Sequence, residues 1–78
     1  MKILAFGIVK EILGSGSIDV VPDEGMTVER LKAKLEQQYP GLKQLSSFMI
    51  AVNNEYATGG KIISAKDEIA IIPPVSGG

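Results

Sequence analysis

The feature that most constrains the fold is one long amphipathic segment, residues 27–39, in the middle of a 78-residue chain. Polar side chains fill most of its positions, and the apolar ones recur at helical spacing: Val28, Leu31, Leu35 and Tyr39. Thr27 is a typical N-cap, and Pro40 followed by Gly41 ends the pattern. Because a helix with one apolar stripe needs a second layer to cover that stripe, we expect this helix to lie on a sheet.

Apolar runs near the two ends of the sequence predict strands. Residues 3–9 and residues 69–72 are too short for stable helices and are rich in isoleucine. Such runs are typical of strands covered on both faces, so we expect these two strands to lie side by side at the centre of the sheet. After the first run, residues 10–13 are expected to form a helical turn and residues 17–21 the second strand of a hairpin.

Further strand segments follow the helix. Residues 48–52 form one, a tight turn at Asn53–Asn54 leads into residues 55–57, and residues 61–63 form a short edge segment. A hairpin, then a helix, then further strands indicates an α+β fold rather than an alternating α/β fold. We therefore expect a β-grasp, or ubiquitin-like, architecture with a mixed four- to five-stranded sheet packed on one main helix. The domain is expected at 1–74, followed by a flexible tail at 75–78.

The side chains leave little room for catalysis by this chain alone. It has no cysteine and no histidine, which removes Cys/His zinc sites, Ser-His-Asp and Cys-His triads and the commonest general base. The carboxylate pairs Asp23–Glu24 and Asp67–Glu68 point apart in turns or strands, so we interpret them as solvated turn residues. The glycines at 14–16 and 59–60 lack the spacing of phosphate-binding loops and are interpreted as turns.

Charge and hydropathy exclude two further classes of partner. Eight basic and nine acidic residues give a net charge of −1, and aromatic residues make up 5% of the chain, so nucleic-acid binding is not expected. The apolar runs are far shorter than the roughly 20 residues of a membrane-spanning helix. Residues 1–3 lead directly into a predicted strand, without a signal-peptide pattern. We expect a soluble, cytoplasmic protein that binds neither nucleic acid nor membrane.

The most unusual segment is the C-terminal one. The last predicted strand is followed by Pro73, Pro74, Val75, Ser76, Gly77 and Gly78. Two prolines extend a chain away from a domain, and two glycines then form a thread without side chains, which suits insertion into a narrow site of another protein. The α-carboxylate at its end is ionised at neutral pH and is a poor electrophile, so a partner must activate it. A frayed terminus is the alternative interpretation.

Three apolar residues have two possible roles. Spacing alone favours Phe6, Tyr56 and Ile72 as members of the core. They could instead form an exposed apolar patch, which in a small protein would mark a partner surface.

With these residues the chain resembles the small subunit of molybdopterin synthase, the MoaD-like sulfur carriers of the ubiquitin-like superfamily. The terminal run at 73–78 is similar to the family's terminal signature, and the run at 6–14 is similar to its first strand and short helix. The residues at 51–53 and 67–70 also match, so the resemblance covers essentially the whole chain. Lys66 stands where the family usually has glycine, which leaves the type of that turn open.

The resemblance implies a cycle of sulfur transfer. An E1-like adenylating enzyme would use ATP and magnesium to activate the Gly78 carboxylate, and a sulfurtransferase would supply the sulfur that converts it to a thiocarboxylate. The tail, which includes Gly77, would then enter the large subunit of molybdopterin synthase and donate sulfur to cyclic pyranopterin monophosphate. The chain itself would bind no cofactor or metal, and the complete synthase would be a heterotetramer.

The resemblance also implies which residues contact the partners. Phe6, Tyr56 and Ile72 fall where the family places apolar contacts, and Pro73, Pro74, Val75 and Ser76 are expected to contact a partner as well. Three alternatives remain: a thiamine-type sulfur carrier, a ubiquitin-like modifier conjugated to lysines, and an interaction module that tolerates loss of Gly78.

Overall fold

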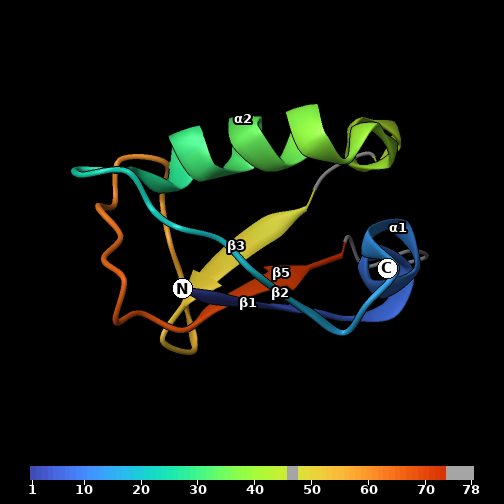
Figure 1. Ribbon diagram of the computed structural model, residues 1–78, viewed down its shortest axis with the longest axis horizontal. Coiled ribbons are helices and arrows are strands. Elements are labelled where there is room, and N and C mark those ends of the chain that lie inside the picture. Colours follow the sequence, from blue (N-terminus) through green and yellow to red (C-terminus); the bar gives the residue numbers. More distant parts are fainter. Residues whose placement is uncertain (46–47, 74–78) are drawn as a thin grey trace.

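A five-stranded mixed sheet carries the long helix on one of its faces in the computed structural model, which describes residues 1–45 and 48–73 (Figure 1). In chain order the elements are β1 (Lys2–Ala5), α1 (Gly7–Leu13), β2 (Ser17–Asp19), α2 (Val28–Gln38), the 3-10 helix η1 (Pro40–Gln44), β3 (Met49–Val52), β4 (Glu55–Tyr56) and β5 (Ile69–Ile72). The strand order across the sheet is β2-β1-β5-β3-β4. This is the β-grasp arrangement that the sequence predicts.

The prediction that the first and last strands are neighbours is confirmed. β1 and β5 run parallel, with Ile3 opposite Ile69 and Ala5 opposite Ile71. The other pairs, β1 with β2, β3 with β5 and β3 with β4, are antiparallel. Strand β5 therefore lies between β1 and β3, and the chain leaves it at the end of the sheet where α1 begins (Figure 1).

The prediction of one strand over residues 3–9 is wrong. Strand β1 ends at Ala5, and Gly7 takes a φ of +55°, a backbone conformation that an extended strand does not contain. The rest of the run forms α1, which buries Val9 and Leu13 and includes the predicted helical turn at 10–13. Gly14, with a φ of +78°, ends α1 by donating its N–H to the carbonyl of Lys10.

Helix α2 begins as predicted. The Thr27 hydroxyl accepts a hydrogen bond from the backbone N–H of Arg30 at 3.2 Å, and Glu29 lies in the first turn, where the helix dipole favours negative charge. Leu31 and Leu35 are fully buried against the sheet. Tyr39 is the C-terminal cap, and η1 follows from Pro40.

The remaining turns and edges agree with the expected order of elements. Asn53 and Asn54 form the tight turn between β3 and β4 with φ values of +52° and +70°. The expected edge segment at 61–63 is a single antiparallel bridge between Thr27 and Ile62. Lys66 lies in a turn that the N–H of Asp67 closes on the carbonyl of Ser64, and it has no positive φ, so glycine is not required there.

The expectation that the central strands are covered on both faces is also wrong. Side chains that alternate along β1, β3 and β5 fill the core under α2; they are Ile3, Ala5, Ile50, Val52, Ile69 and Ile71. The opposite side of the sheet carries Leu4, Ala70 and Ile72, which are only partly buried, and Met49, which is exposed. Within 1–45 and 48–73, no helix is long and apolar enough to cross a membrane.

Candidate functional site

The side of the sheet opposite α2 carries an apolar surface, which we call the open face. Its residues come from four strands and the β1–α1 junction: Leu4, Phe6, Met49, Ala51, Tyr56, Ala70 and Ile72. Strand pairing brings them together, because Met49 is opposite Ile72 and Ala51 is opposite both Ala70 and Tyr56. Residues opposite one another in adjacent strands point to the same side of a sheet.

Phe6 and Tyr56 are surface residues, so the core interpretation from spacing alone is wrong for them. The exposed fraction of the residue is 49% for Phe6 and 66% for Tyr56, whereas Ile72 is partly buried. Their place on the open face fits the role that the resemblance implies. Their contact with a partner stays a prediction.

The open face is hollowed into a shallow groove of about 310 Å³. Small side chains, Ala51 and Ala70, lie among the larger Leu4, Phe6, Tyr56 and Ile72, and two polar residues, Asn54 and Glu68, also line it. Alanines between large side chains leave a depression that an apolar side chain of a partner can fill. A contiguous exposed apolar surface on a small protein is typical of a protein–protein contact.

The chain leaves the open face at Ile72 and continues through Pro73 toward the predicted tail. A Cβ atom placed on Gly7 would lie 3.5 Å from the Cγ atom of Pro73, so the first proline passes directly beside the β1–α1 junction. Phe6 is the N-cap residue of α1 and lies at this junction. The predicted site residues Pro74, Val75, Ser76, Gly77 and Gly78 lie outside the described residues.

A polar cluster joins the β3–β4 turn to the start of β5. The Asn53 side chain donates from Nδ2 to Oδ1 of Asp67 at 2.9 Å and accepts at Oδ1 from the Glu68 N–H at 2.9 Å. Oδ2 of Asp67 accepts from the Ser64 N–H at 2.8 Å, and the Asn53 N–H donates to the Glu68 carbonyl at 2.8 Å. We call these four residues the Asn53–Asp67 clasp. Asp67 is thus a solvent-accessible residue beside a turn, as expected, and it is also a structural hydrogen-bond acceptor.

The clasp also determines the electrostatics of Asp67. Hydrogen bonds from the Ser64 backbone and then from the Asn53 side chain lower the pKa of Asp67 below its ordinary value of 3.8, and the charge of Lys61 lowers this pKa further. Asp67 is therefore a carboxylate that accepts hydrogen bonds at neutral pH, and not a proton donor.

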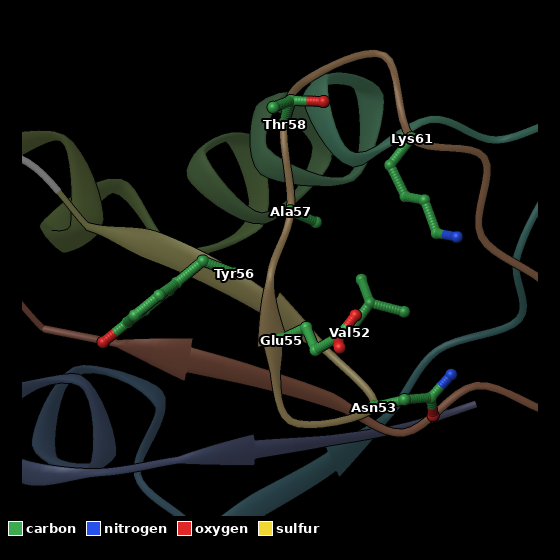
Figure 2. Close-up of a pocket in the computed structure, with 7 residues that line it drawn as sticks. All are labelled: Val52, Asn53, Glu55, Tyr56, Ala57, Thr58 and Lys61. Carbon is green, nitrogen blue, oxygen red and sulfur yellow. The ribbon is translucent and has the colours of Figure 1, made fainter.

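A second, more polar hollow of about 280 Å³ lies on the other side of β4 (Figure 2). Asn53 and Lys61 reach toward it from opposite sides, whereas the ring of Tyr56 points away from Lys61. Because Tyr56 lines both hollows, it forms the ridge between them. The charged groups here are Glu55 and Lys61, and they suggest no reaction.

Sequence reasoning missed four residues of the open face: Leu4, Met49, Ala51 and Ala70. The alternation of strand residues between the two faces of a sheet could have identified them. Positions 4, 70 and 72 alternate with the buried positions 3, 69 and 71. An apolar residue at every position of β5 hides that alternation.

A family model described as the ThiS family matches residues 3–78. A curated relative from Dictyostelium discoideum, named molybdopterin synthase sulfur carrier subunit, is 44% identical over 81 residues, covering 99% of this chain and 94% of its own. One of the same name from Arabidopsis thaliana is 34% identical over 79 residues, covering 100% and 82%.

Two solved structures extend the comparison. SAMP1 from Haloferax volcanii superposes with a TM-score of 0.82 at 29% identity, covering 99% of this chain and 97% of its own. A chain in the complex of subunits 1 and 2 of the molybdopterin-converting factor from Helicobacter pylori has a TM-score of 0.62 at 28% identity, covering 99% and 96%. The chain therefore belongs to the ThiS family and is a homologue of the molybdopterin synthase sulfur carrier subunits.

Proposed function

We propose that this chain carries sulfur for molybdenum cofactor biosynthesis, as the small subunit of a molybdopterin synthase. The observation that carries the proposal is similarity over the full length to relatives named molybdopterin synthase sulfur carrier subunit, with a family match that includes Gly77 and Gly78. The proposed reactive group is the Gly78 carboxylate. A partner must activate it, since an ionised carboxylate resists nucleophilic attack.

The proposed chemistry has three steps. An E1-like adenylating enzyme, with ATP and magnesium, converts the Gly78 carboxylate to an acyl-adenylate and releases pyrophosphate. Sulfide-level sulfur, released from a sulfurtransferase persulfide by a thiol reductant, displaces AMP and leaves a thiocarboxylate. The large synthase subunit then receives the charged tail and passes its sulfur to cyclic pyranopterin monophosphate. The partners supply the catalytic groups and cofactors. This chain supplies the carboxyl carbon of Gly78, to which the sulfur is bound, and the docking surface.

The open face supports this division of roles. Its apolar groove lies on the strand that leads into the tail, and Pro73 passes beside the Phe6–Gly7 junction. A partner that covers the groove would therefore receive the tail next to the contact. We propose that the large subunit docks there, with one small subunit at each end of a heterotetramer. The complex of subunits 1 and 2 from Helicobacter pylori supports a partner of this kind. The cytoplasmic location expected from the sequence stays a prediction.

Mass spectrometry of the intact chain tests the proposal. Incubation with the adenylating enzyme, ATP, magnesium and a sulfur source should replace one oxygen of the chain by sulfur. Addition of the large subunit and cyclic pyranopterin monophosphate should then regenerate the carboxylate. A chain that never acquires sulfur under these conditions contradicts the proposal.

A modifier role is the second candidate, because SAMP1, a small archaeal modifier protein by name, superposes over nearly the whole chain. A modifier would leave isopeptide adducts on lysines of other proteins, which proteomics of cells expressing the tagged chain would detect. The thiamine-type alternative is separated by complementation: the chain should restore a strain lacking the molybdopterin carrier and not one lacking the thiamine carrier.

A further inference from the structure

We propose that Asn53 and Asp67 are positioning residues: their clasp holds β4 so that Tyr56 stays on the open face in the orientation that a partner binds. This inference rests on the proposed function for the identity of the partner. Neither side chain lines the open groove, so neither is offered as a contact residue.

The clasp joins segments that are far apart in the sequence. Its bonds between Asn53 and residues 67 and 68 span 14 and 15 positions. Asn53 uses its backbone N–H, its side-chain amide and its side-chain carbonyl, so three groups of one residue connect the β3–β4 turn to the start of β5. Asp67 is anchored in turn by the Ser64 N–H.

Strand β4 has little else to hold it. It contains two residues, it is an edge strand, and in the sheet it pairs only with β3. The turn that leads into it has two consecutive residues in the left-handed region, a conformation that asparagine tolerates better than most residues but that is still unfavourable. An edge strand of two residues has only marginal stability of its own. We therefore infer that the side-chain hydrogen bonds of Asn53 offset the strain of the turn.

The clasp is directly connected to the groove. Asn54 and Glu68, the polar residues that line the groove, are the immediate neighbours of Asn53 and Asp67. Tyr56 follows two residues after Asn54, and its largely exposed ring has little packing to fix it. Opening of the clasp would therefore release the turn, the strand and the ridge residue together, and leave the core under α2 intact.

Hydrogen exchange on the free chain tests the structural half of the inference. The reporter is the Ala57 N–H, which donates to the Ile50 carbonyl at 3.0 Å beside β4. Asn53→Gly removes the side-chain bonds but permits the positive φ, so it should speed exchange at Ala57 by about tenfold and leave the amides of β1 and β5 unchanged. Unchanged exchange at Ala57 would overturn the inference.

A double-mutant cycle tests the functional half. Asn53→Gly and Asp67→Asn should each weaken binding to the large subunit by about fivefold to tenfold, and Asn53→Gly should weaken it no further in a Tyr56→Ala chain. Asp23→Asn is the matched control, because Asp23 faces Arg30 at 4.0 Å on α2, outside the groove, and should bind as the unmodified chain does. Equal losses with and without the Tyr56 ring would contradict positioning through Tyr56.

The exchange experiment and the binding experiment test different statements. An unmodified chain that fails to bind the large subunit contradicts the proposed function. It also contradicts the proposal that Tyr56 is oriented to bind that subunit. The exchange at Ala57 still decides whether the clasp holds β4.

Discussion

The two faces of the sheet come from the same strands and carry similar residues, yet α2 covers only one of them. On the covered face, Ile3, Ile69 and Ile71 are fully buried under α2. On the open face, Leu4, Ala70 and Ile72 alternate with them and line a groove. Apolar composition therefore marks a strand as central in the sheet, but it does not show whether the chain itself or a partner covers each face.

Truncation on the covered face should have the largest effect on stability. Leu31→Ala removes a fully buried side chain, so the free energy of unfolding should fall by about 2–5 kcal/mol, measured by urea denaturation. Ile62→Ala is the control, because Ile62 is 63% exposed. It should change the free energy of unfolding by less than about 1 kcal/mol. Equal losses for both variants would remove the distinction between core and surface.

Truncation on the open face should instead weaken a complex. Phe6→Ala should weaken the binding free energy for the large subunit by about 1–3 kcal/mol, because a half-exposed aromatic residue that lines an apolar groove is a typical hot spot. Calorimetry measures the affinity, and a thermal melt checks the fold. Val21→Ala is the matched control, since Val21 is exposed but lies outside the groove. A loss of about 3–5 kcal/mol of stability in Phe6→Ala would return this residue to the core.

Loss of the helix cap should have a smaller effect. Thr27→Ala removes the oxygen that accepts from the Arg30 N–H, and should lower the free energy of unfolding by about 0.5–2 kcal/mol. Thr27→Ser keeps the oxygen and should retain most of that stability. A Ser variant as unstable as the Ala variant would show that Thr27 acts by a means other than capping.

Loss of the Asp67 charge at low pH should have the smallest effect on stability. Because the pKa of Asp67 is lowered in the folded chain, its hydrogen bonds stabilise the fold fully above the ordinary carboxyl pKa, and this stabilisation is lost as the pH falls through the lowered value. Because the chain has other acidic residues, Asp67→Asn is the necessary comparison. The difference in melting temperature between the two chains should narrow as the pH falls below about 4. A difference that stays constant from neutral to acidic pH would contradict this role.

Local sequence signals predicted most of the fold. The cap at Thr27, the stripe on α2 and the Asn53–Asn54 turn each act through neighbours in the chain, so they can be interpreted without tertiary information. The end of β1 at Ala5 could not be predicted, because the positive φ of Gly7 is one of several conformations open to glycine.

The site was predicted only in part. Phe6, Tyr56 and Ile72 followed from resemblance, whereas spacing alone favoured the core. The remaining groove residues depend on the register of β1 and β3 against β5, and so does the clasp, whose members are 14 and 15 positions apart. Register is a tertiary property that no single segment encodes.

If sulfur is carried on the carboxyl group of Gly78, deletion of this one residue should abolish sulfur transfer and leave the fold intact. A chain without Gly78 should melt at the same temperature as the full chain, because a terminal glycine buries no side chain. In the mass-spectrometric assay with the adenylating enzyme, ATP and a sulfur source, the full chain should acquire sulfur and the truncated chain should not. A truncated chain that still forms a thiocarboxylate and supports molybdopterin synthesis would contradict the role of Gly78 as the sulfur carrier.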